Sequence, residues 1–336
     1  MTLEWVEPGC HPVADGVYRI PLTLPQDGLR AVNVYVLETD SGLALIDGGW
    51  HRPDTYLEFS TALAEIGRSP DEVHDVYVTH IHRDHYTFAV ELRRRHGARV
   101  HLGSKEAAGL DEIALVNSNV PETSLGELRR AGAPQLAADA YALTVDEPFD
   151  LADWETPDGW LSPGMLPLAG RNIEAVHTPG HTKGHIVFHD HDNSLSFTGD
   201  HILPRITPSI GFELGKPDLP LGRFLDSLTM MADDDTHTVA PAHGAVGGKV
   251  GSRARDLLRH HDVRLDQILE ILDQCGPQNG HAVASTLTWT GRNRSFASLD
   301  TLNQMFAVCE TMAHLNLLVV RGELSLGHAD EVSVYS

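Results

Sequence analysis

The feature that most restricts the fold of this chain is a cluster of histidine and aspartate residues directly after a short apolar segment. Val76–Val78 predicts a buried strand, and the next seven residues read Thr-His-Ile-His-Arg-Asp-His. They include four potential metal ligands: His80, His82, Asp84 and His85. On a tight loop at the carboxyl end of a strand, where α/β proteins place their sites, these side chains can converge on a divalent cation.

Three later segments each place one more potential ligand directly after a predicted strand. His181 follows the strand at 173–176, Asp200 follows the strand at 195–197, and His243 follows the strand at 238–240. A single histidine after a strand is usually only a hydrogen-bonded loop residue. Four strands are each followed by potential ligands, and together they predict a metal site formed by histidine and aspartate side chains.

The order of the predicted elements indicates an α/β fold. Strands are expected at 16–22, 31–37, 43–47, 75–79, 98–102, 173–176, 186–189, 195–198 and 237–240, and helices at 53–66, 86–95 and 220–232. Between them, residues 104–160 have no strand pattern, and helices are expected at 106–117, 124–131 and 135–142. This segment is interpreted as an insertion that forms either a lid over a site or a helical layer packed on the sheet.

The chain changes character after Gly251. Helices are expected at 253–274, 281–287 and 298–315, followed by two strands at 317–320 and 323–326 around a turn at Arg321-Gly322. Three helices and a hairpin are the order of a small winged-helix-like module, so the chain is divided into residues 1–250 and 251–336. The second part has seven Arg and no Lys against ten acidic residues, which disfavours nucleic-acid binding and favours packing or a homodimer.

Charge and cysteine content restrict the partners and the compartment. The 336 residues include 25 Lys and Arg against 47 Asp and Glu, a formal net charge of −22, which repels nucleic acids and anionic membranes. No apolar stretch approaches the length of a membrane span, and no signal peptide is apparent. The three cysteines are far apart and odd in number, which predicts reduced thiols and a cytoplasmic protein.

With these residues in place, the sequence resembles the metallo-β-lactamase fold superfamily over about residues 15–245. The resemblance implies an αβ/βα sandwich of two mixed sheets, with residues 1–250 as the catalytic domain. It further implies two metal ions, the first held by His80, His82 and His181 and the second by Asp84, His85 and His243, with Asp200 bridging both. The position of His82 is Glu in the flavin-partnered di-iron branch of the family, so this chain departs from that branch.

Two further residues match positions beside the ligands of the family. Asp47, in the segment Asp-Gly-Gly after an early strand, is implied to orient a ligand, and His185 is a weaker candidate for the same kind of role. By contrast, the segment His189-Asp190-His191-Asp192 lies between two predicted strands and precedes Asn-Ser, so it is interpreted as an exposed hairpin loop.

The resemblance implies a hydrolase in which two divalent ions, zinc or alternatively iron or manganese, hold hydroxide as the nucleophile. Asp84 is expected to handle the proton. The overall pattern is similar to glyoxalase-II-like and β-lactamase-like hydrolases with a winged-helix tail, which implies an ester, thioester or lactone substrate, either a small molecule or an acyl group on a carrier. Three alternatives remain: an RNA nuclease of the same superfamily, a mononuclear iron dioxygenase of the persulfide type, and a structural metal site.

Overall fold

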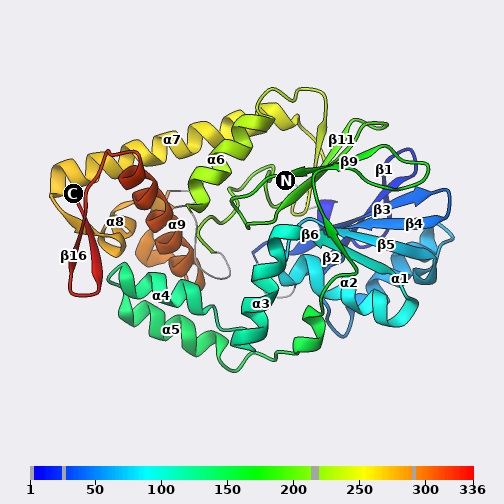
Figure 1. Ribbon diagram of the computed structural model, residues 1–336, viewed down its shortest axis with the longest axis horizontal. Helices are drawn as coiled ribbons and strands as arrows, with labels where there is room; N and C mark the ends of the chain where they lie inside the picture. Colours follow the sequence, from blue (N-terminus) through cyan, green and yellow to red (C-terminus); the bar gives the residue numbers. More distant parts are fainter. Residues whose placement is uncertain (1–3, 25–27, 213–218, 290–292) are drawn as a thin grey trace.

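A seven-stranded mixed sheet is the first layer of the fold (Figure 1). The structure is a computed structural model that describes residues 4–24, 28–212, 219–289 and 293–336. In spatial order the strands are β1 (His11–Ala14), β2 (Val17–Thr23), β3 (Ala31–Thr39), β4 (Gly42–Ile46), β5 (Val73–Val78), β6 (Arg99–Gly103) and β7 (Gly159–Leu161). β1 to β4 form an antiparallel meander, and β4 to β7 are parallel.

The second sheet has five strands in the order β12-β11-β10-β9-β8. Its strands are β8 (Gly164–Met165), β9 (Ile173–His177), β10 (Ile186–Asp190), β11 (Leu195–Gly199) and β12 (Thr238–Pro241). β10 is antiparallel to both β9 and β11, whereas β11 and β12 are parallel. The carboxyl ends of β9, β11 and β12 therefore lie at one edge of the sheet, and the carboxyl end of β10 lies at the opposite edge.

The two sheets pack face to face between layers of helices. Tyr35 and Leu37 of β3 pack with Phe188 and Phe197 of the second sheet, whereas the alternate β3 residues 32, 34 and 36 point to the helices on the other face. This alternation explains why β3 is buried on both faces. Helices α1 (Thr55–Glu65), α2 (Arg83–His96) and α3 (Ala107–Val116) cover the first sheet, and α6 (Pro220–Met231) and α7 (Val250–Cys275) cover the second. The αβ/βα sandwich is confirmed.

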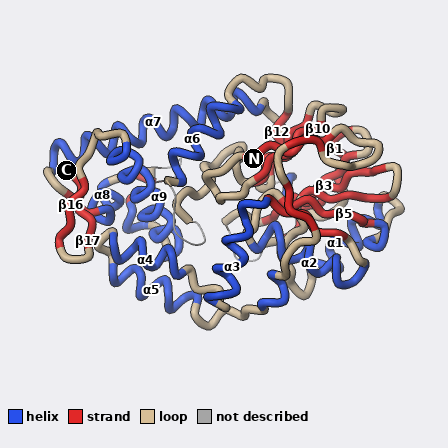
Figure 2. The backbone as a smooth tube through the Cα atoms, in the orientation of Figure 1, coloured by secondary structure: helices blue, strands red, loops and turns tan. Residues whose placement is uncertain are grey.

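The remaining helices gather at one end of the molecule, away from most of the strands (Figure 2). They are α4 (Glu122–Arg130), α5 (Pro134–Thr144), α8 (Gly280–Thr286) and α9 (Thr301–Val320), with short strands β13 (Gln278–Asn279), β14 (Thr288–Trp289), β15 (Arg294–Ser295), β16 (Leu326–Ala329) and β17 (Val332–Tyr335). The 3-10 turns are η1 (Glu4–Val6), η2 (Pro70–Glu72), η3 (Ser104–Glu106), η4 (Leu151–Trp154) and η5 (Phe296–Ser298).

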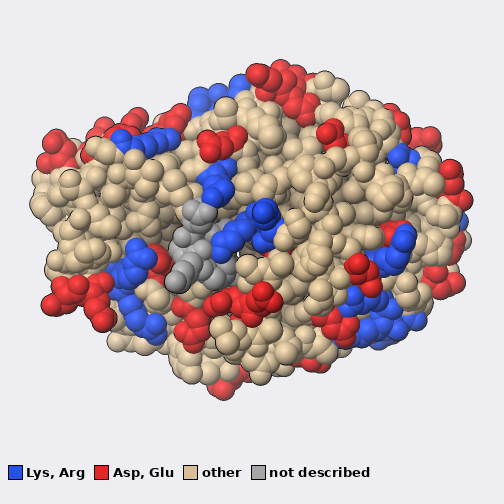
Figure 3. Space-filling model, in the orientation of Figure 1, with Lys and Arg blue, Asp and Glu red and all other residues tan. Residues whose placement is uncertain are grey.

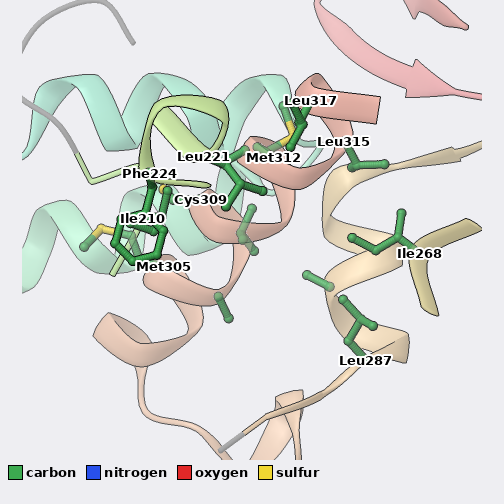
Figure 4. Packing of buried hydrophobic residues seen from close by; sticks show 14 of the residues in the cluster. Ile210, Leu221, Phe224, Ile268, Leu287, Met305, Cys309, Met312, Leu315 and Leu317 are labelled. Carbon is green, nitrogen blue, oxygen red and sulfur yellow. The ribbon is translucent and has the colours of Figure 1, made fainter. Parts of the chain in front are cut away.

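One apolar core joins these helices to the second sheet. Phe224 of α6, Ile268 of α7 and Met305 of α9 belong to the same buried cluster (Figure 4), and Leu125 of α4 and Leu136 of α5 join it. The later part of the 104–160 insertion thus packs against α9, while Leu110 and Ile113 of α3 pack on the first sheet. The division at residue 250 stays a prediction.

Two details of the sequence-based expectations are wrong. Residues 317–320 are the last turn of α9 instead of a strand, because Leu317 and Leu318 are buried in the helical core, and the hairpin consists of β16 and β17 further along the chain. In addition, α2 begins at Arg83, so Asp84 and His85 lie in its first turn rather than on a loop.

Among the described residues, no helix combines the length and the apolar character that crossing a membrane requires.

A partly buried glutamate in α9 gives the stability of the fold a specific pH dependence. Burial raises the pKa of Glu310 to about 7, although the guanidinium of Arg264 opposes this shift. A carboxyl whose pKa is higher in the folded state than in the unfolded state stabilises the fold at low pH and loses this contribution as pH rises through 7. We expect Glu310→Gln to be more stable than the wild type at pH 8 by about 1–2 kcal/mol, and to match it at pH 4.5. Urea unfolding at both pH values measures the difference; exposed Glu323→Gln is the control, and equal curves at pH 8 would contradict the expectation.

Candidate metal centre

Three histidines from two loops form the first group of potential ligands. His80 and His82 lie between β5 and α2, and His181 lies between β9 and β10. Nδ1 of His82 is 3.0 Å from Nε2 of His80 and 3.1 Å from Nε2 of His181. Three ring nitrogens that face one point are the arrangement in which imidazoles bind a divalent cation.

A second group lies directly beside the first. It consists of Asp84 and His85, in the first turn of α2, and His243, which follows β12. Oδ2 of Asp84 is 3.4 Å from Nε2 of His243 and 3.7 Å from Nε2 of His85. The site draws on both sheets because β5 belongs to the first and β12 to the second.

Asp200, directly after β11, faces both groups. Its Oδ2 is 3.5 Å from Nε2 of His181, and its Oδ1 is 3.3 Å from Nε2 of His243 and 3.8 Å from Nε2 of His85. One carboxylate therefore offers one oxygen to each group. The structure brings together all seven residues for which the sequence predicted a role as ligands.

Asp47 holds one of these histidines in place. The residue follows β4 with a φ of 63° and is buried. Its Oδ1 accepts a hydrogen bond from the backbone N–H of Thr79 (2.8 Å), and its Oδ2 lies 3.0 Å from Nδ1 of His85. Because a carboxylate only accepts, Nδ1 of His85 donates, and a cation that displaces the Nε2 proton would find the lone pair on the nitrogen that faces the cluster.

Backbone carbonyls orient two further ligands in the same way. Nδ1 of His181 lies 2.8 Å from the carbonyl oxygen of Ser209, and Nδ1 of His243 lies 2.8 Å from that of Ala31. A carbonyl accepts only, so both rings donate from Nδ1 and keep a lone pair on Nε2. The sequence did not predict these contacts, because any residue has a backbone carbonyl and these two are distant in sequence from the histidines.

His185 holds the backbone of Asp200 by a hydrogen bond. Its Nε2 accepts a hydrogen bond from the backbone N–H of Asp200 at 3.3 Å, and its Nδ1 lies 2.9 Å from the hydroxyl of Thr178. The hydroxyl of Thr79 makes a comparable contact, 3.0 Å from Nδ1 of His80. Neither threonine was given a functional role from the sequence, although Thr79 begins the segment with four ligands and Thr178 lies three residues before His181.

The pKa values of the histidines differ between the two groups of ligands. Burial lowers the pKa of His82 to about 3. For His85, burial also opposes the charged form, but the carboxylates of Asp47, Asp84 and Asp200 outweigh it and raise the pKa to about 10. Burial likewise opposes ionisation of Asp84, yet His85 and His243 hold its pKa well below the usual range. The carboxylate of Asp84 is thus ionised at neutral pH and attracts cations.

The site fits a pair of divalent cations. Within the described ranges, three buried atoms that face the second group of ligands have no hydrogen-bond partner: Nε2 of His85 and His243, and Oδ1 of Asp200. Buried polar atoms are normally satisfied, and imidazole and carboxylate donors suit zinc, iron or manganese. Since Oδ1 and the two Nε2 atoms of His85 and His243 face one another, a cation there would satisfy all three.

Substitution of Asp47 tests how much its hydrogen bonds contribute to metal affinity. We expect Asp47→Asn to weaken the binding of the cation beside His85 by about 10–100-fold, because an amide cannot accept from both Thr79 and His85 with two oxygens. Competition with a chromophoric chelator measures the affinity. Asp40→Asn, in the β3–β4 turn, is the control, and unchanged affinity of the Asp47 variant would show that the contact does not orient the ligand.

Comparisons with known proteins agree with this geometry. The profile of the Metallo-beta-lactamase superfamily matches residues 27–243. The "Lactamase-like protein nscB" of Neosartorya fischeri is 26% identical over 244 residues, which are 73% of this chain and 57% of that protein. The "Hydroxyacylglutathione hydrolase GloC" of Haemophilus influenzae is 30% identical over 149 residues, 44% of this chain and 55% of that protein. The chain thus spans less than two thirds of the length of these curated relatives.

Two solved structures match nearly the whole chain. A metallo-beta-lactamase family protein from Thermus thermophilus is 26% identical with a TM-score of 0.77 and covers 96% of this chain and 98% of its own. A beta-lactamase domain protein from Burkholderia ambifaria is 25% identical with a TM-score of 0.74 and covers 97% and 93%. The profile, these structures and the fold lead to one conclusion: the chain belongs to the metallo-beta-lactamase superfamily.

Proposed function

We propose that the protein is a binuclear metallohydrolase that cleaves a carboxylic ester, thioester or lactone. The observation that carries the proposal is the position of Asp200, whose two carboxylate oxygens face separate groups of ligands. His80, His82 and His181 would hold one cation, and Asp84, His85 and His243 the other. When bound, two such ions lower the pKa of water and polarise a carbonyl.

The residues of the chain have distinct tasks in this proposal. Asp84 is ionised, and its side chain is 18% exposed, so a carboxylate oxygen can accept the proton of an attacking water and return it to the leaving group. Asp47 and His185 keep His85 and Asp200 in position through their hydrogen bonds. No covalent intermediate with the chain is required.

A cavity that shares Phe212 with the surroundings of His82 offers a place for the acyl part of the substrate. The ring of Phe212 lies 6.1 Å from the ring of His82 and 5.0 Å from that of Phe306. Phe212 also lines a small cavity together with Ile113, Val116 and Val120 of the α3–α4 region. Because Glu112, Ser118, Glu122, Thr123 and Ser124 also line this cavity, it fits a small molecule or a carrier-bound acyl group that has both apolar and polar parts.

Surface charge disfavours the nuclease alternative. On the face drawn in Figure 3, acidic and basic side chains form separate small groups with broad uncharged areas between them. With a formal net charge of −22, the chain is poorly suited to the phosphate contacts on which RNA binding depends. The relative named as a hydroxyacylglutathione hydrolase supports the hydrolase proposal instead.

An activity screen with a matched variant tests the proposal. Metal-loaded protein is assayed on aryl esters, acyl thioesters, lactones and a structured RNA, with metal analysis of the same sample. We expect hydrolysis of at least one carbonyl substrate and a fall of at least about 100-fold in kcat for Asp84→Asn, with activity unchanged for the exposed His328→Gln. We also expect about two metal ions per chain at the candidate centre, measured as the difference from a chain that carries His82→Ala and His243→Ala. Cleavage of RNA alone, or a single iron per chain with oxygen consumption, would overturn the proposal.

A further inference from the structure

A second cluster of histidine and acidic side chains lies at the edge of the second sheet opposite to the candidate metal centre. β10 runs antiparallel to β9 and β11, so its carboxyl end, with His189, lies where those strands begin. His237 precedes β12, and His243 of the candidate centre follows the other end of this strand. The four residues of β12 span about 13 Å, so the second cluster is separate from the first.

The structure corrects the interpretation of this segment as an exposed loop. His189 and Asp190 belong to β10, where His189 pairs with Glu174 of β9 and with Ser196 of β11. The exposed fraction is 9% for His189 and 0% for Asp190. The antiparallel ladder continues through both residues, and the exposed turn begins only at His191.

Three side chains of the cluster lie at distances suited to a shared cation. One nitrogen from each of His189 and His237 and one carboxylate oxygen of Asp234 lie within 4.8 Å of one another, and the two rings stack with centroids 4.5 Å apart. Nδ1 of His237 lies 2.8 Å from Oδ2 of Asp234. When the ring proton of His237 is on Nε2, its Nδ1 lone pair and Oδ2 of Asp234 are close enough to bind one cation.

Two buried polar atoms at this place point independently to a bound group. Nδ1 of His189 and the hydroxyl oxygen of Ser196 have no hydrogen-bond partner in the part of the chain that the structure describes. Ser196 is completely buried, and its register with His189 places both side chains on the same face of the sheet. Buried polar side chains without a partner are uncommon, so this face can accept a further polar ligand.

The charges around the cluster favour a cation. Burial opposes ionisation of Asp234, but hydrogen bonds from His237 outweigh it and lower the pKa of this carboxyl, which is therefore ionised. Burial lowers the pKa of His189 to about 4, so the ring is neutral and has a free lone pair at neutral pH. His191 lies 3.0 Å from the carboxylate of Glu174 and adds a further acidic neighbour. The ammonium of Lys249, bound to the carbonyl of Thr236 nearby, is exposed and screened by solvent.

We propose that His189, His237 and Asp234 bind a divalent transition-metal ion at this edge of the sheet, and that the ion is Zn²⁺. Two imidazoles and a carboxylate are typical zinc ligands, and the neighbouring hydroxyl of Ser196 or a water completes the coordination. The ligands come from the end of β10, the start of β12 and the segment after α6. A cation there cross-links three elements and stabilises the second sheet.

Zinc titration of full-length variants tests this site. Metal-free protein is titrated with Zn²⁺ against a chromophoric chelator, and thermal unfolding is followed with and without the metal. To distinguish this site from the candidate metal centre, the titration is repeated in a chain that carries His82→Ala and His243→Ala. These substitutions remove one ligand from each group of the candidate centre. We expect one Zn²⁺ per chain to remain bound in that chain and to raise its Tm.

The matched substitutions decide the outcome. His237→Gln and Asp234→Asn are expected to weaken this remaining equivalent at least about 10-fold and to abolish its effect on Tm, whereas His328→Gln, on the exposed strand β16, leaves both unchanged. His237 is buried and Asp234 is partly buried, so each variant is checked for folding by its circular dichroism spectrum. The proposal is overturned if the chain without the candidate centre binds no Zn²⁺, or if folded variants bind it as tightly as their parent.

Discussion

Asp200→Ala is expected to reduce kcat/KM by about 10³-fold, equivalent to about 4 kcal/mol of transition-state stabilisation. The carboxylate faces both groups of ligands, with its oxygens 3.5 Å from Nε2 of His181 and 3.3 Å from Nε2 of His243. In the proposed binuclear centre, this substitution removes the one carboxylate that would bind both cations. Steady-state assays and metal analysis of the purified variant measure the two consequences.

The control for this substitution is Asp273→Ala. Asp273 is an exposed residue of α7 outside the metal centre, so its loss changes the charge of the chain by the same amount without altering the ligands. We expect its activity and metal content to equal those of the wild type. If Asp200→Ala retained the metal content of the wild type and activity within about twofold of it, the carboxylate would not bridge the two groups.

Gly180→Ala is expected to have the largest effect on stability, a loss of roughly 2–5 kcal/mol. Gly180 has a φ of 139°, a conformation that alanine adopts only with strain. An added Cβ would lie 2.4 Å from Cα of Phe224 and 2.6 Å from its backbone nitrogen, so α6 would have to move away from the β9–β10 loop. The movement also displaces His181, the next residue, and metal affinity should fall with stability.

Urea unfolding with and without bound metal measures this effect. Gly126→Ala is the matched control, because Gly126 lies within α4 and a Cβ there has no atom within 4 Å. We expect the control to be more stable than the wild type by about 0.5–1 kcal/mol. A Gly180→Ala protein with the unfolding midpoint of the wild type would show that the contact between the loop and α6 can relax without cost.

Much of the fold was predictable because its elements have strong local patterns. Short apolar strands such as Val76–Val78, and the amphipathic α6, were placed within a few residues of their observed bounds. The apolar run at 317–320 was wrong because four apolar residues fit a strand and a buried helix equally well. Its position at the end of α9, against the helices that pack there, decided between the two.

The sequence by itself determined which residues could be ligands, because histidine and aspartate directly after apolar strands are a local feature of the chain. Only the tertiary structure decided how they are used. The face-to-face packing of two sheets sets Asp200 between two groups of rings, and carbonyls of Ala31 and Ser209, far along the chain, select which nitrogen of His243 and His181 is free. The same holds at the opposite edge, where strand register buries His189, because burial and hydrogen-bond partners depend on neighbours that are distant in sequence.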